Sequence, residues 1–535
     1  MSKYIFITGG VVSSLGKGIT AASLGRLLKN RGFKVTIQKI DPYLNVDAGT
    51  MSPLQHGEVF VTDDGTEADL DIGHYERFLD ENLTGSHSLT TGKVYRAVIE
   101  KERKGFYKGG TVQVIPHVTN EIKERILKVG EESGAELVIV EVGGTVGDIE
   151  SLPHLEALRQ LRHDLGRGNV LFVHVTLVPQ VGATGEQKTK PTQHSVKELR
   201  SLGLQPDIII TRSEKPLSAD LREKIALFCD VEPKAVIDNT DVDTIYAVPL
   251  VLEEQGLADL VLEKLQLPRR APTDLTLWRQ MVEAIRHPED EIHITVAGKY
   301  PTSSDAYLSL HEALVHAAAS FHVGLKIHWL DGDDQQILPP DTQGIIIPAG
   351  FGPRGTASMM KAAQVAREEK IPFLGICLGL HVAAIEWARH VAGLEDADSR
   401  EFNPGCRTCL VEYLPGQEGA EHTGGTMRLG GADIRVEEGS LAYRLYQKPV
   451  VRERHRHRFA LNEAYVPQLE ESGLRVTGRS LEGNIAEILE ARSDLHPFYL
   501  LVQFHPELIS RPGRPHPLLA GFLQAVRALQ RQRAK

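Results

Sequence analysis

Two series of short apolar runs organise this chain. The first has runs beginning at residues 4, 34, 136, 170 and 207, and the second at 292, 326, 344, 373 and 499. Segments with helical spacing lie between the runs, and this alternation predicts α/β domains with doubly wound parallel sheets. We therefore expect one α/β domain at 1–266, a linker with one short helix at 267–291, and a second α/β domain at 292–535.

Composition narrows the functional class. A chain of 535 residues is too long for one compact core. The net charge of -11 argues against a nucleic-acid polymer as partner. No apolar run is long enough to span a bilayer, nothing resembles a signal peptide, and four cysteines are too few for a disulfide scaffold. These features predict a cytoplasmic enzyme that does not bind a membrane.

A glycine-rich loop at residues 9–19, "GGVVSSLGKGI", directly follows the first apolar run. It departs from a Walker A loop, because five residues rather than four separate Gly10 from Gly16, and Gly18 stands where the hydroxyl residue belongs. Strand, loop and helix nevertheless form the context of a phosphate site, with backbone N–H groups and Lys17 facing an anion. The domain at 1–266 is therefore expected to be P-loop NTPase-like, with a plain glycine-rich turn at residues 9–19 as the alternative.

Acidic and basic stretches elsewhere in the first series fit such a site. Glu141 ends an apolar run and Asp71 lies in a polar segment, and oxygen ligands of this kind suit Mg²⁺. Each acid alone is more often solvated surface. The stretches 143–151 and 187–195 combine glycines, acids, lysines and threonines, which suit phosphate and base recognition better than a core. The first domain is therefore predicted to hold two phosphorylated ligands.

The second series carries a different chemistry. Residues 375–379, "GICLG", are the cysteine version of a nucleophile elbow, and the helix that follows favours the thiolate of Cys377. His505 ends another strand and supplies a base, with Glu507 to orient the ring. The glycines of 348–355 offer an oxyanion hole. This combination disfavours a merely structural cysteine.

Two further features are predicted to be inert. Cys406 and Cys409 form a CxxC pair without a second pair, so we expect no zinc site there. The run "RERHRHR" at 452–458 is expected to be a solvated face.

These motifs, taken together, resemble the CTP synthase family over essentially the whole chain. The segments that carry the resemblance are "GGVVSSLGKG", "DPYLNVDAGTMSPLQHGEVFVTDDG", "EVGGTVGDIESLP", "KTKPTQHS", "GICLG", "ERHRHR" and "QFHPE". The family uses the long, serine-free loop as its ATP site. The resemblance implies that ATP phosphorylates O4 of UTP and that ammonia displaces the phosphate to give CTP. Ammonia would come from L-glutamine, hydrolysed in a class I glutamine amidotransferase domain.

Matching the family motifs by position implies a set of residues for each ligand. The ATP set is Ser14, Leu15, Gly16, Lys17, Gly18, Ile19, Asp71 and Arg212. The UTP or CTP set is Ser14, Asp148, Ile149, Glu150, Lys188, Thr189, Lys190, Pro191, Thr192, Gln193 and Lys224. The glutamine set is Gly350, Leu378, Gly379, Leu380, His381, Glu401 and Arg458. The catalytic residues that the resemblance implies are Cys377, His505 and Glu507 for glutamine hydrolysis, and Lys17 for the ATP reaction. Gly350 would line the oxyanion hole, Arg458 would pair with the substrate carboxylate, and Asp71 and Glu141 would bind Mg²⁺.

The resemblance also implies regulation and assembly. GTP would activate the glutaminase half, and CTP would act as feedback inhibitor. The family forms homotetramers whose pyrimidine site spans subunits, and it also forms filaments.

Three departures from the family pattern lie in the glutaminase half. Ala349 replaces a glycine of the oxyanion loop, His381 replaces a glutamine, and the segment after Leu410 is shortened. A histidine with an ordinary pKa near ~6.5 would switch its charge in the working range. We therefore expect the KM for glutamine to rise as the pH falls towards 6, unless His381 packs on its own helix away from the substrate.

Two other readings compete with this one. A cobyrinate-amidating or dethiobiotin-synthetase-like ligase would share the phosphate loop but would lack "KTKPTQHS" and "GGTVGDIES" together. An assembly protein would not need catalytic groups, whereas Lys17, Asp71, Glu141 and Cys377 are all intact.

Overall fold

The computed structural model describes residues 2–182, 185–300, 304–331, 338–419 and 424–533. Packing divides the chain into two compact units, 1–48 with 71–282 and 49–70 with 283–535. The predicted domain boundaries at 266 and 292 remain predictions. The short segment 49–70 packs with the second unit although it lies near the N-terminus of the chain.

The first unit is built on a seven-stranded sheet with the order β11-β10-β7-β1-β6-β2-β5. Its strands are β1 Lys3–Gly9, β2 Val35–Asp41, β5 Ser88–Thr90, β6 Leu137–Val142, β7 Val170–Leu177, β10 Ile208–Ser213 and β11 Val236–Thr240. All pairs in this sheet are parallel, as the apolar runs predicted. The short strands β8 Gln180–Val181 and β9 Glu186–Gln187 form a separate hairpin.

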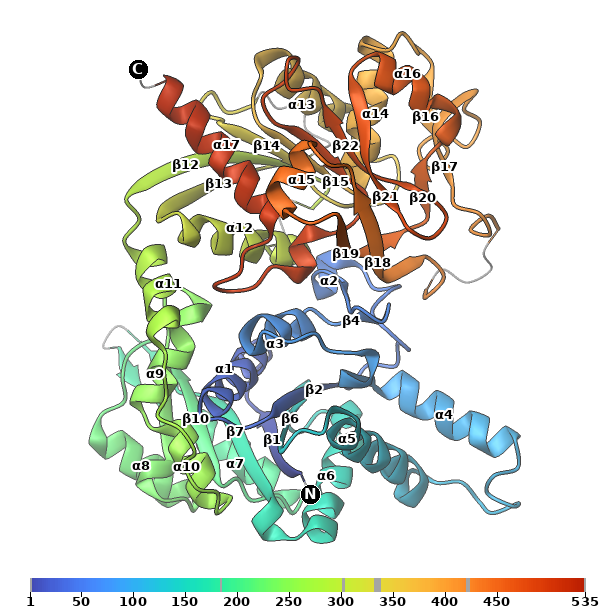
Figure 1. The fold of residues 1–535 in the computed structure, drawn as a ribbon. Helices are drawn as coiled ribbons and strands as arrows, with labels where there is room; N and C mark the ends of the chain where they lie inside the picture. Colours follow the sequence, from blue (N-terminus) through green and yellow to red (C-terminus); the bar gives the residue numbers. More distant parts are fainter. Residues whose placement is uncertain (1, 183–184, 301–303, 332–337, 420–423, 534–535) are drawn as a thin grey trace. The chain divides into compact units, whose positions relative to one another are not determined.

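Helices cover both faces of this sheet (Figure 1). They are α1 Lys17–Asn30, α3 Asp71–Leu79, α4 Thr91–Arg103, α5 Thr119–Ser133, α6 Leu152–Leu165, α7 Lys190–Ser201, α8 Ala219–Cys229, α9 Val248–Glu254 and α10 Leu257–Lys264. Phe6, Val138 and Val140 pack against α5 and α6. The alternate side chains Ile37 and Ile139 meet α1, where Gly25 lets the helix approach closely. The sheet is therefore doubly wound, as predicted.

Helix α11 Thr276–Arg286 lies in the stretch 267–291, where one short helix was expected, and the role of this stretch as a linker remains a prediction. Next along the chain, the second unit has a nine-stranded sheet with the order β13-β12-β14-β15-β23-β22-β21-β18-β19. Its strands are β12 Asp290–Gly298, β13 Val323–Asp331, β14 Gly344–Ile347, β15 Phe373–Ile376, β18 Arg428–Val436, β19 Val450–His457, β21 Leu474–Ser480, β22 Ala486–Ala491 and β23 Tyr499–Val502. The half from β13 to β23 is parallel, as predicted, and the other half is antiparallel.

Two apolar clusters cover the faces of the second sheet. The helices are α12 Leu308–Ser320, α13 Thr356–Glu369, α14 Leu378–His390, α15 Leu441–Tyr446, α16 Val466–Glu471 and α17 Pro517–Arg533. One cluster joins α13 and α14 to Ile345 and Phe373, and the other joins α12 and α17 to Ile346 and Leu374. The remaining elements are α2 Pro53–His56, β3 Phe60–Val61, β4 Glu67–Ala68, β16 Ala397–Ser399, β17 Thr408–Tyr413 and β20 Phe459–Leu461.

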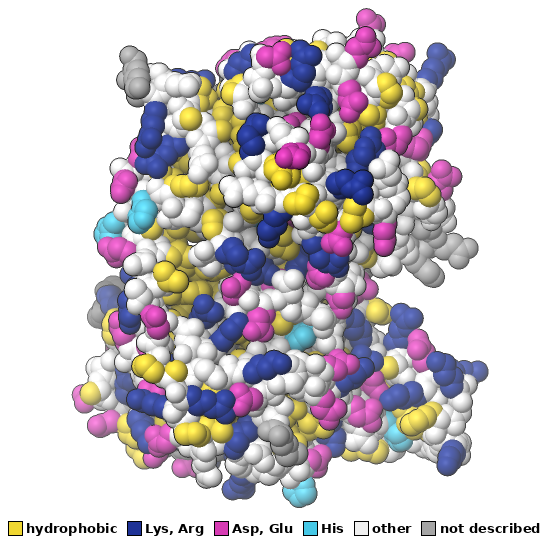
Figure 2. All heavy atoms as spheres, in the orientation of Figure 1, with side chains coloured by type: hydrophobic (Ala, Val, Ile, Leu, Met, Phe, Trp, Pro, Cys, Tyr) yellow, Lys and Arg dark blue, Asp and Glu magenta, His cyan; other side chains and the backbone are white. Residues whose placement is uncertain are grey.

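Lysine and arginine side chains are interspersed with acidic ones on the face drawn in Figure 2. No helix within the described ranges combines the length and apolar character needed to cross a membrane.

Candidate active sites

Cys377 lies on a sharp turn between β15 and α14. Its backbone angles are φ 53° and ψ −101°, in the left-handed region that residues other than glycine rarely adopt. A Cβ on Gly379 would lie 2.1 Å from the carbonyl oxygen of Ile347, and one on Gly375 would lie 2.8 Å from the backbone of Gly379. Close packing therefore requires both glycines of the Gly-x-Cys-x-Gly pattern, and the strained turn presents the thiol at the start of α14.

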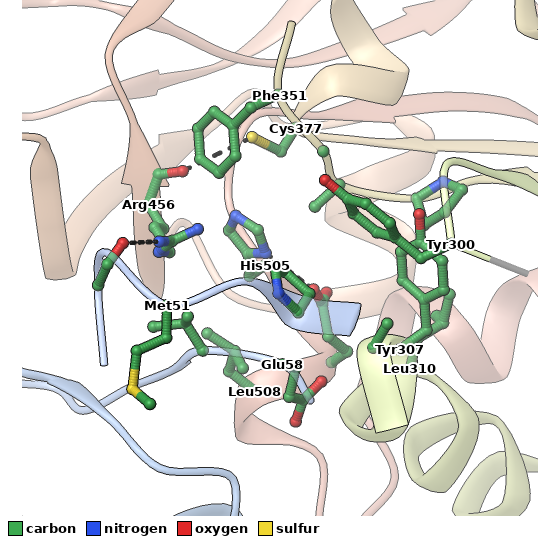
Figure 3. Close-up of a pocket in the computed structure, with 18 of the residues that line it drawn as sticks. Met51, Glu58, Tyr300, Tyr307, Leu310, Phe351, Cys377, Arg456, His505 and Leu508 are labelled. Carbon is green, nitrogen blue, oxygen red and sulfur yellow. Dashed lines mark hydrogen bonds and ion pairs between the residues drawn. The ribbon is translucent and has the colours of Figure 1, made fainter. Parts of the chain in front are cut away.

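His505 reaches the same edge of the sheet from β23. This strand pairs in parallel with β15, with Val502 opposite Ile376, so the chain segments after both strands emerge side by side. The His505 Nδ1 atom lies 2.8 Å from Glu507 Oε1, which leaves Nε2 to exchange a proton with the thiol. Figure 3 shows Cys377 and His505 around one pocket.

The charge state of His505 suits proton donation. Burial by itself lowers the pKa of this imidazole, but the Glu507 carboxylate and the Cys377 sulfur outweigh it and raise the pKa to about 10. The ring is thus an imidazolium at neutral pH. That form can stabilise a thiolate and protonate a departing amine.

The pocket beside these groups has a volume of about 200 Å³. From the predicted set it is lined by Gly350, Cys377, His505 and Glu507, and from residues 49–70 by Gly49, Thr50, Met51, Pro53, Glu58 and Val59. The 49–70 segment is held there by Ser309 N, which donates to Glu58 Oε2 at 2.8 Å, and by Arg456 Nε, which donates to Glu67 Oε1 at 2.8 Å. No pattern in the sequence indicated that this distant segment forms a wall of the pocket beside Cys377.

The oxyanion loop 348–355 is held from two sides. Glu401 Oε1 accepts a hydrogen bond from Gly352 N at 2.7 Å. Burial raises the pKa of Glu401, and the bond from Gly352 only partly offsets this rise. On the other side, the buried Lys299 donates to the carbonyl oxygens of Gly352 and, at 2.6 Å, Arg354. The sequence analysis did not predict a role for Lys299. Its position directly after the apolar run at 292, at the end of an expected strand, could have indicated one.

His381 faces inward rather than lining this pocket. Its Nε2 atom lies 2.9 Å from Gln503 Oε1, and Gln503 Nε2 lies 3.8 Å from Cys377 Sγ. The ring is only 2% exposed. Burial lowers the pKa of His381 to about 4, and the hydrogen bond with Gln503 offsets only part of this effect. The expected charge switch near pH 6 is therefore wrong, because desolvation keeps the ring neutral there.

We now expect the pH dependence of the KM for glutamine to be independent of His381 between pH 6 and 8. With a pKa of about 4, roughly 1% of the rings are protonated at pH 6. The ratio of KM values at pH 6 and pH 8 should thus agree within about 2-fold between the unaltered chain and His381→Gln. Steady-state glutaminase assays at both pH values measure this ratio. A KM rise at pH 6 that disappears in His381→Gln would contradict it.

Other members of the glutamine set lie outside the pocket lining. Leu378, Gly379 and Leu380 belong to the first turn of α14. Arg458 donates to Gln417 Oε1 at 3.1 Å and to Thr426 Oγ1 at 2.9 Å, whereas Arg456 lines the pocket. The role of Arg458 in glutamine binding remains a prediction.

The run 452–458 is not a solvated face, so that expectation is wrong. Arg454, His455 and His457 are at most 1% exposed. Partners distant in sequence satisfy the polar groups of these buried side chains. Arg454 Nη1 donates to Val61 O at 3.1 Å, and His455 Nε2 lies 3.0 Å from Glu487 Oε2.

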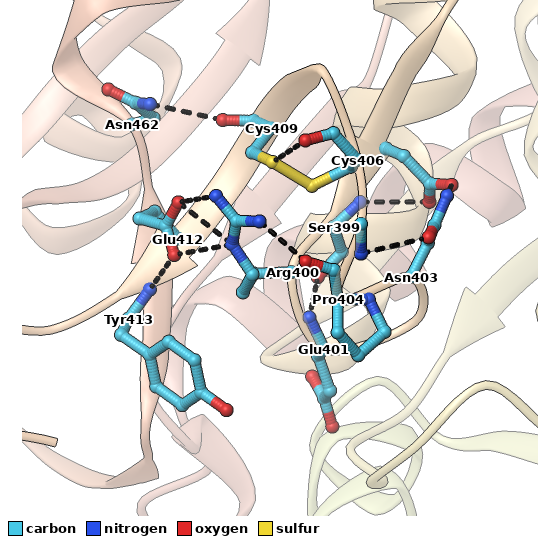
Figure 4. The surroundings of a disulfide bond; sticks show 12 residues. Ser399, Arg400, Glu401, Asn403, Pro404, Cys406, Cys409, Glu412, Tyr413 and Asn462 are labelled. Carbon is cyan, nitrogen blue, oxygen red and sulfur yellow. Dashed lines mark hydrogen bonds and ion pairs between the residues drawn. A yellow bond between two sulfur atoms is a disulfide. The ribbon is translucent and has the colours of Figure 1, made fainter. Parts of the chain in front are cut away.

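Cys406 and Cys409 form a disulfide (Figure 4), which the cysteine count did not lead us to expect. The nearby Arg400 forms hydrogen bonds with both carboxylate oxygens of Glu412 and with the carbonyl oxygen of Pro404. These bonds anchor the segment that carries Glu401. Part of the shortened segment after Leu410, residues 420–423, lies outside the described residues.

In the first unit, the glycine-rich loop joins β1 to α1. Gly16 is the N-cap of α1 and has φ 82°, a conformation that favours glycine. Lys17 is buried, and its Nζ donates to Gly144 O at 2.9 Å, which brings the loop beside the stretch 143–151. A Cβ on Gly18 would lie 2.0 Å from Asp71 Oδ1. The Asp71 carboxylate therefore fills the space where a Walker A loop has its hydroxyl side chain.

Asp71 and Glu141 meet at one buried ammonium group, that of Lys39. Lys39 Nζ forms an ion pair with Asp71, lies 2.7 Å from Glu141 Oε2 and lies 3.9 Å from Asp41 Oδ1. Tyr75 Oη donates to Glu141 Oε2 at 2.6 Å. Burial by itself raises the pKa of Asp71, but Lys39 outweighs it and the net pKa is below its ordinary value.

The sequence prediction found two of the three carboxylates in this cluster. Lys39, Asp41 and Tyr75 were missed, although charged residues at the end of the apolar run at 34 were a usable signal. Carboxylate oxygens that converge on one cation are the donor set that Mg²⁺ prefers. The three carboxylates therefore supply oxygen donors that fit a magnesium ion, which would have to displace the Lys39 ammonium group that they now contact.

The stretch 187–195 lies against the glycine-rich loop. A Cβ on Gly10 would lie 1.6 Å from Ser195 Oγ. Within the stretch, Thr192 Oγ1 donates to Leu177 O at 3.0 Å and Gln193 Nε2 donates to Thr189 Oγ1 at 3.1 Å, so these side chains form contacts inside the protein.

Most charged members of the nucleotide sets are more accessible to solvent than Thr192 and Gln193, although Lys17 is buried. Arg212 lies beside the loop, with Nη1 3.3 Å from the position of a Cβ on Gly16. Exposed or half-buried members of the nucleotide sets are Ser14, Gly16, Ile19, Asp71, Asp148, Ile149, Glu150, Lys188, Lys190, Pro191, Arg212 and Lys224. Their roles in binding remain predictions.

Comparison with known proteins follows the same division of the chain. Residues 3–267 match the family model "CTP synthase N-terminus", and residues 303–525 match "Glutamine amidotransferase class-I". The chain is 55% identical to a CTP synthase of Bacillus cytotoxicus over 530 residues, covering 98% of both chains. It is 56% identical to a CTP synthase of Geobacillus kaustophilus over 530 residues, covering 98% of this chain and 99% of the relative.

Among solved structures, the glutaminase domain of Trypanosoma brucei CTPS with bound acivicin is 33% identical, with a TM-score of 0.41. That match covers 44% of this chain and 94% of the trypanosomal one. Because curated relatives are more than half identical over nearly the entire length, the chain belongs to the CTP synthase family.

Proposed function

We propose that this protein catalyses the ATP-dependent amination of UTP to CTP with ammonia released from L-glutamine. The observation that carries the proposal is the presence of two different sites in one chain, a Cys377–His505–Glu507 group and a phosphate loop beside a carboxylate cluster. The direct test mixes the protein with UTP, ATP, Mg²⁺ and either glutamine or an ammonium salt, and follows the absorbance of CTP. Absence of CTP with both nitrogen sources would refute the assignment.

In the glutaminase half, Cys377 attacks the side-chain amide carbon of glutamine. Backbone N–H groups of the loop that contains Gly350 stabilise the negative charge that develops on oxygen. His505 protonates the departing nitrogen and ammonia leaves. His505 then accepts a proton from water, which attacks the thioester to give glutamate and the free thiol. Glu507 keeps the ring oriented through both steps.

In the synthase half, Lys17 and the backbone of the loop bind the ATP phosphates. Asp71 and Glu141, with Asp41 beside them, would hold Mg²⁺, which neutralises phosphate charge when bound. The lysine stabilises charge while O4 of UTP receives the phosphoryl group, and ammonia then displaces the phosphate from C4. The Lys39 ammonium group lies between Asp71 and Glu141 and offsets the repulsion between their charges.

Regulation and assembly complete the proposal. GTP activates the glutaminase half, CTP inhibits at the pyrimidine site, and the protein works as a homotetramer that can form filaments. These features are carried over from the family resemblance, as is the cytoplasmic location, and each needs its own measurement.

Glu150→Ala is expected to weaken CTP inhibition by about 10-fold and to change UTP turnover less. Substrate and inhibitor share the triphosphate, but their bases differ, and a hydrogen bond to a charged group contributes about 1.5–3 kcal/mol. Glu150 is exposed, so the change should not disturb folding. Inhibition constants for CTP and KM values for UTP provide the measurement, with Glu156→Ala on α6 as control. Equal weakening of both ligands would show that Glu150 does not distinguish them.

A further inference from the structure

Outside the sites above, two groups of histidine and acidic side chains in the described residues converge closely enough to hold a metal ion. One comprises His455, His457 and Glu487. There, Arg428 Nη1 donates to Glu487 Oε1 at 2.5 Å and lies 3.3 Å from His457 Nε2. A fixed guanidinium already compensates this buried carboxylate, and it would repel a second cation. This group carries no metal site.

The other group lies at the edge of the nine-stranded sheet and comprises His293, His328 and Asp341. His293 is on β12 and His328 on β13, two register positions apart on the same face. Asp341 precedes β14. Its Oδ2 atom lies 2.5 Å from His293 Nδ1 and 3.3 Å from His328 Nε2. Two imidazole nitrogens from different strands thus point at one carboxylate oxygen.

Backbone contacts fix these three segments together. Gln343 N donates to His293 O at 2.9 Å, and His293 N donates to Gln343 Oε1 at 2.9 Å. Next to them, Thr295 Oγ1 and Thr342 Oγ1 are 2.7 Å apart. The loop that carries Asp341 is therefore tied to β12 and does not depend on the histidines for its position.

A second carboxylate, that of Glu291, lies next to the other ring nitrogen of His293, Nε2. Glu291 Oε1 lies 3.1 Å from His293 Nε2 and can accept its proton in a hydrogen bond. Both ring nitrogens of His293 therefore face carboxylates, and a bound metal ion would take the place of the proton between Nδ1 and Asp341 while Nε2–H still donates to Glu291. Histidine ligands of metals usually donate their other N–H to a carboxylate in this way.

We propose that His293 Nδ1, His328 Nε2 and Asp341 Oδ2 bind a divalent transition-metal ion such as Zn²⁺. Tetrahedral coordination at 2.0–2.1 Å separates ligand atoms by about 3.3 Å. The His328–Asp341 pair already has this separation, and the His293–Asp341 pair reaches it by a small rotation of Asp341, whose side chain is 41% exposed. Solvent supplies the fourth ligand.

The chemistry of the group sets its selectivity. Imidazole nitrogen suits Zn²⁺, Ni²⁺ and Cu²⁺, whereas Mg²⁺ prefers oxygen. Lys326 is the competing cation, with Nζ 3.9 Å from Asp341 Oδ2, but its side chain is 52% exposed and can move into solvent. The bound ion would join the edge strand β13 to β12 and to the loop before β14. It would stabilise the folded state by mass action, separately from the proposed CTP-forming activity.

Zinc binding to the full chain tests this inference. Cys377→Ser serves as the parent, because it removes the catalytic thiol as a competing ligand. Equilibrium dialysis with Zn²⁺ should show one bound equivalent that is lost on adding His328→Gln or Asp341→Asn, together with the Zn²⁺-dependent rise in Tm. Glu291→Gln should weaken this equivalent by roughly 10–100-fold. Mg²⁺ should not displace the bound Zn²⁺ in dialysis, and any rise in Tm that Mg²⁺ causes at other residues should be the same in the parent and in the variants.

His287→Gln is the matched control, because His287 faces a single acid, Glu283, at 3.5 Å and has no second histidine ligand. It should keep the equivalent and the Tm rise. The Tm of each variant without zinc reports whether that variant folds. If His328→Gln does not fold, the test relies on Asp341→Asn. The proposal is overturned if the folded variants bind the same number of zinc ions, with the same affinity, as the parent.

Discussion

Replacing Cys377 by alanine is expected to abolish CTP formation from glutamine and to leave CTP formation from ammonia intact. Loss of a nucleophile of this kind lowers the rate by a factor on the order of 10⁵–10⁶. In the proposed function the thiol serves only to release ammonia, so the synthase site should still use ammonia supplied from solution. CTP absorbance with glutamine, and in parallel with an ammonium salt, measures both activities on one preparation.

The structure offers a matched control for this substitution. Cys229 is also a buried free cysteine, but it is the last residue of α8 and packs in an apolar cluster of the first unit. Cys229→Ala deletes the same atom and should retain both activities. Loss of both activities in a folded Cys377→Ala protein would contradict separate sites for the two half-reactions, and retained glutamine-dependent synthesis would require another nucleophile.

The parts of the molecule that the sequence predicted are those with a local pattern. Parallel strands buried on both faces form continuous apolar runs, so β1, β6, β12 and β15 were recognisable from a few residues each. The elbow at Cys377 and the loop at Gly16 were recognisable for a related reason. Glycines that permit positive φ or close backbone approach stand at fixed positions around one functional residue.

What escaped prediction depends on contacts between segments far apart in the chain. Lys39 belongs to the carboxylate cluster only because β2 and α3 bring Asp71 to its ammonium group. The charged run around His455 is buried because Glu487, on another strand, compensates it. His381 is neutral because the fold desolvates it. In each case the sequence shows which ionisable group the residue carries, but it does not show which partner that group contacts or how deeply it is buried.

Replacing Lys17 by alanine is expected to eliminate CTP formation from both nitrogen sources. The ammonium group lies at the start of α1, where it would stabilise charge on ATP during phosphoryl transfer. Removing one preorganised charge donor of this type costs about 10²–10³ in rate. Basal glutamine hydrolysis should continue, since its nucleophile and base belong to the second unit.

The alternative explanation is structural, because Lys17 is buried and donates to Gly144 O at 2.9 Å. Burial lowers the pKa of Lys17, and Glu141 and other nearby carboxylates offset only part of this effect. Lys17→Met keeps most of the side-chain volume and removes the charge, and it should lose synthesis as fully as Lys17→Ala does. Lys29→Ala, at the other end of α1, should retain it. Near-normal CTP formation from ammonia in a folded Lys17→Met protein would show that the loop's lysine does not act in phosphoryl transfer.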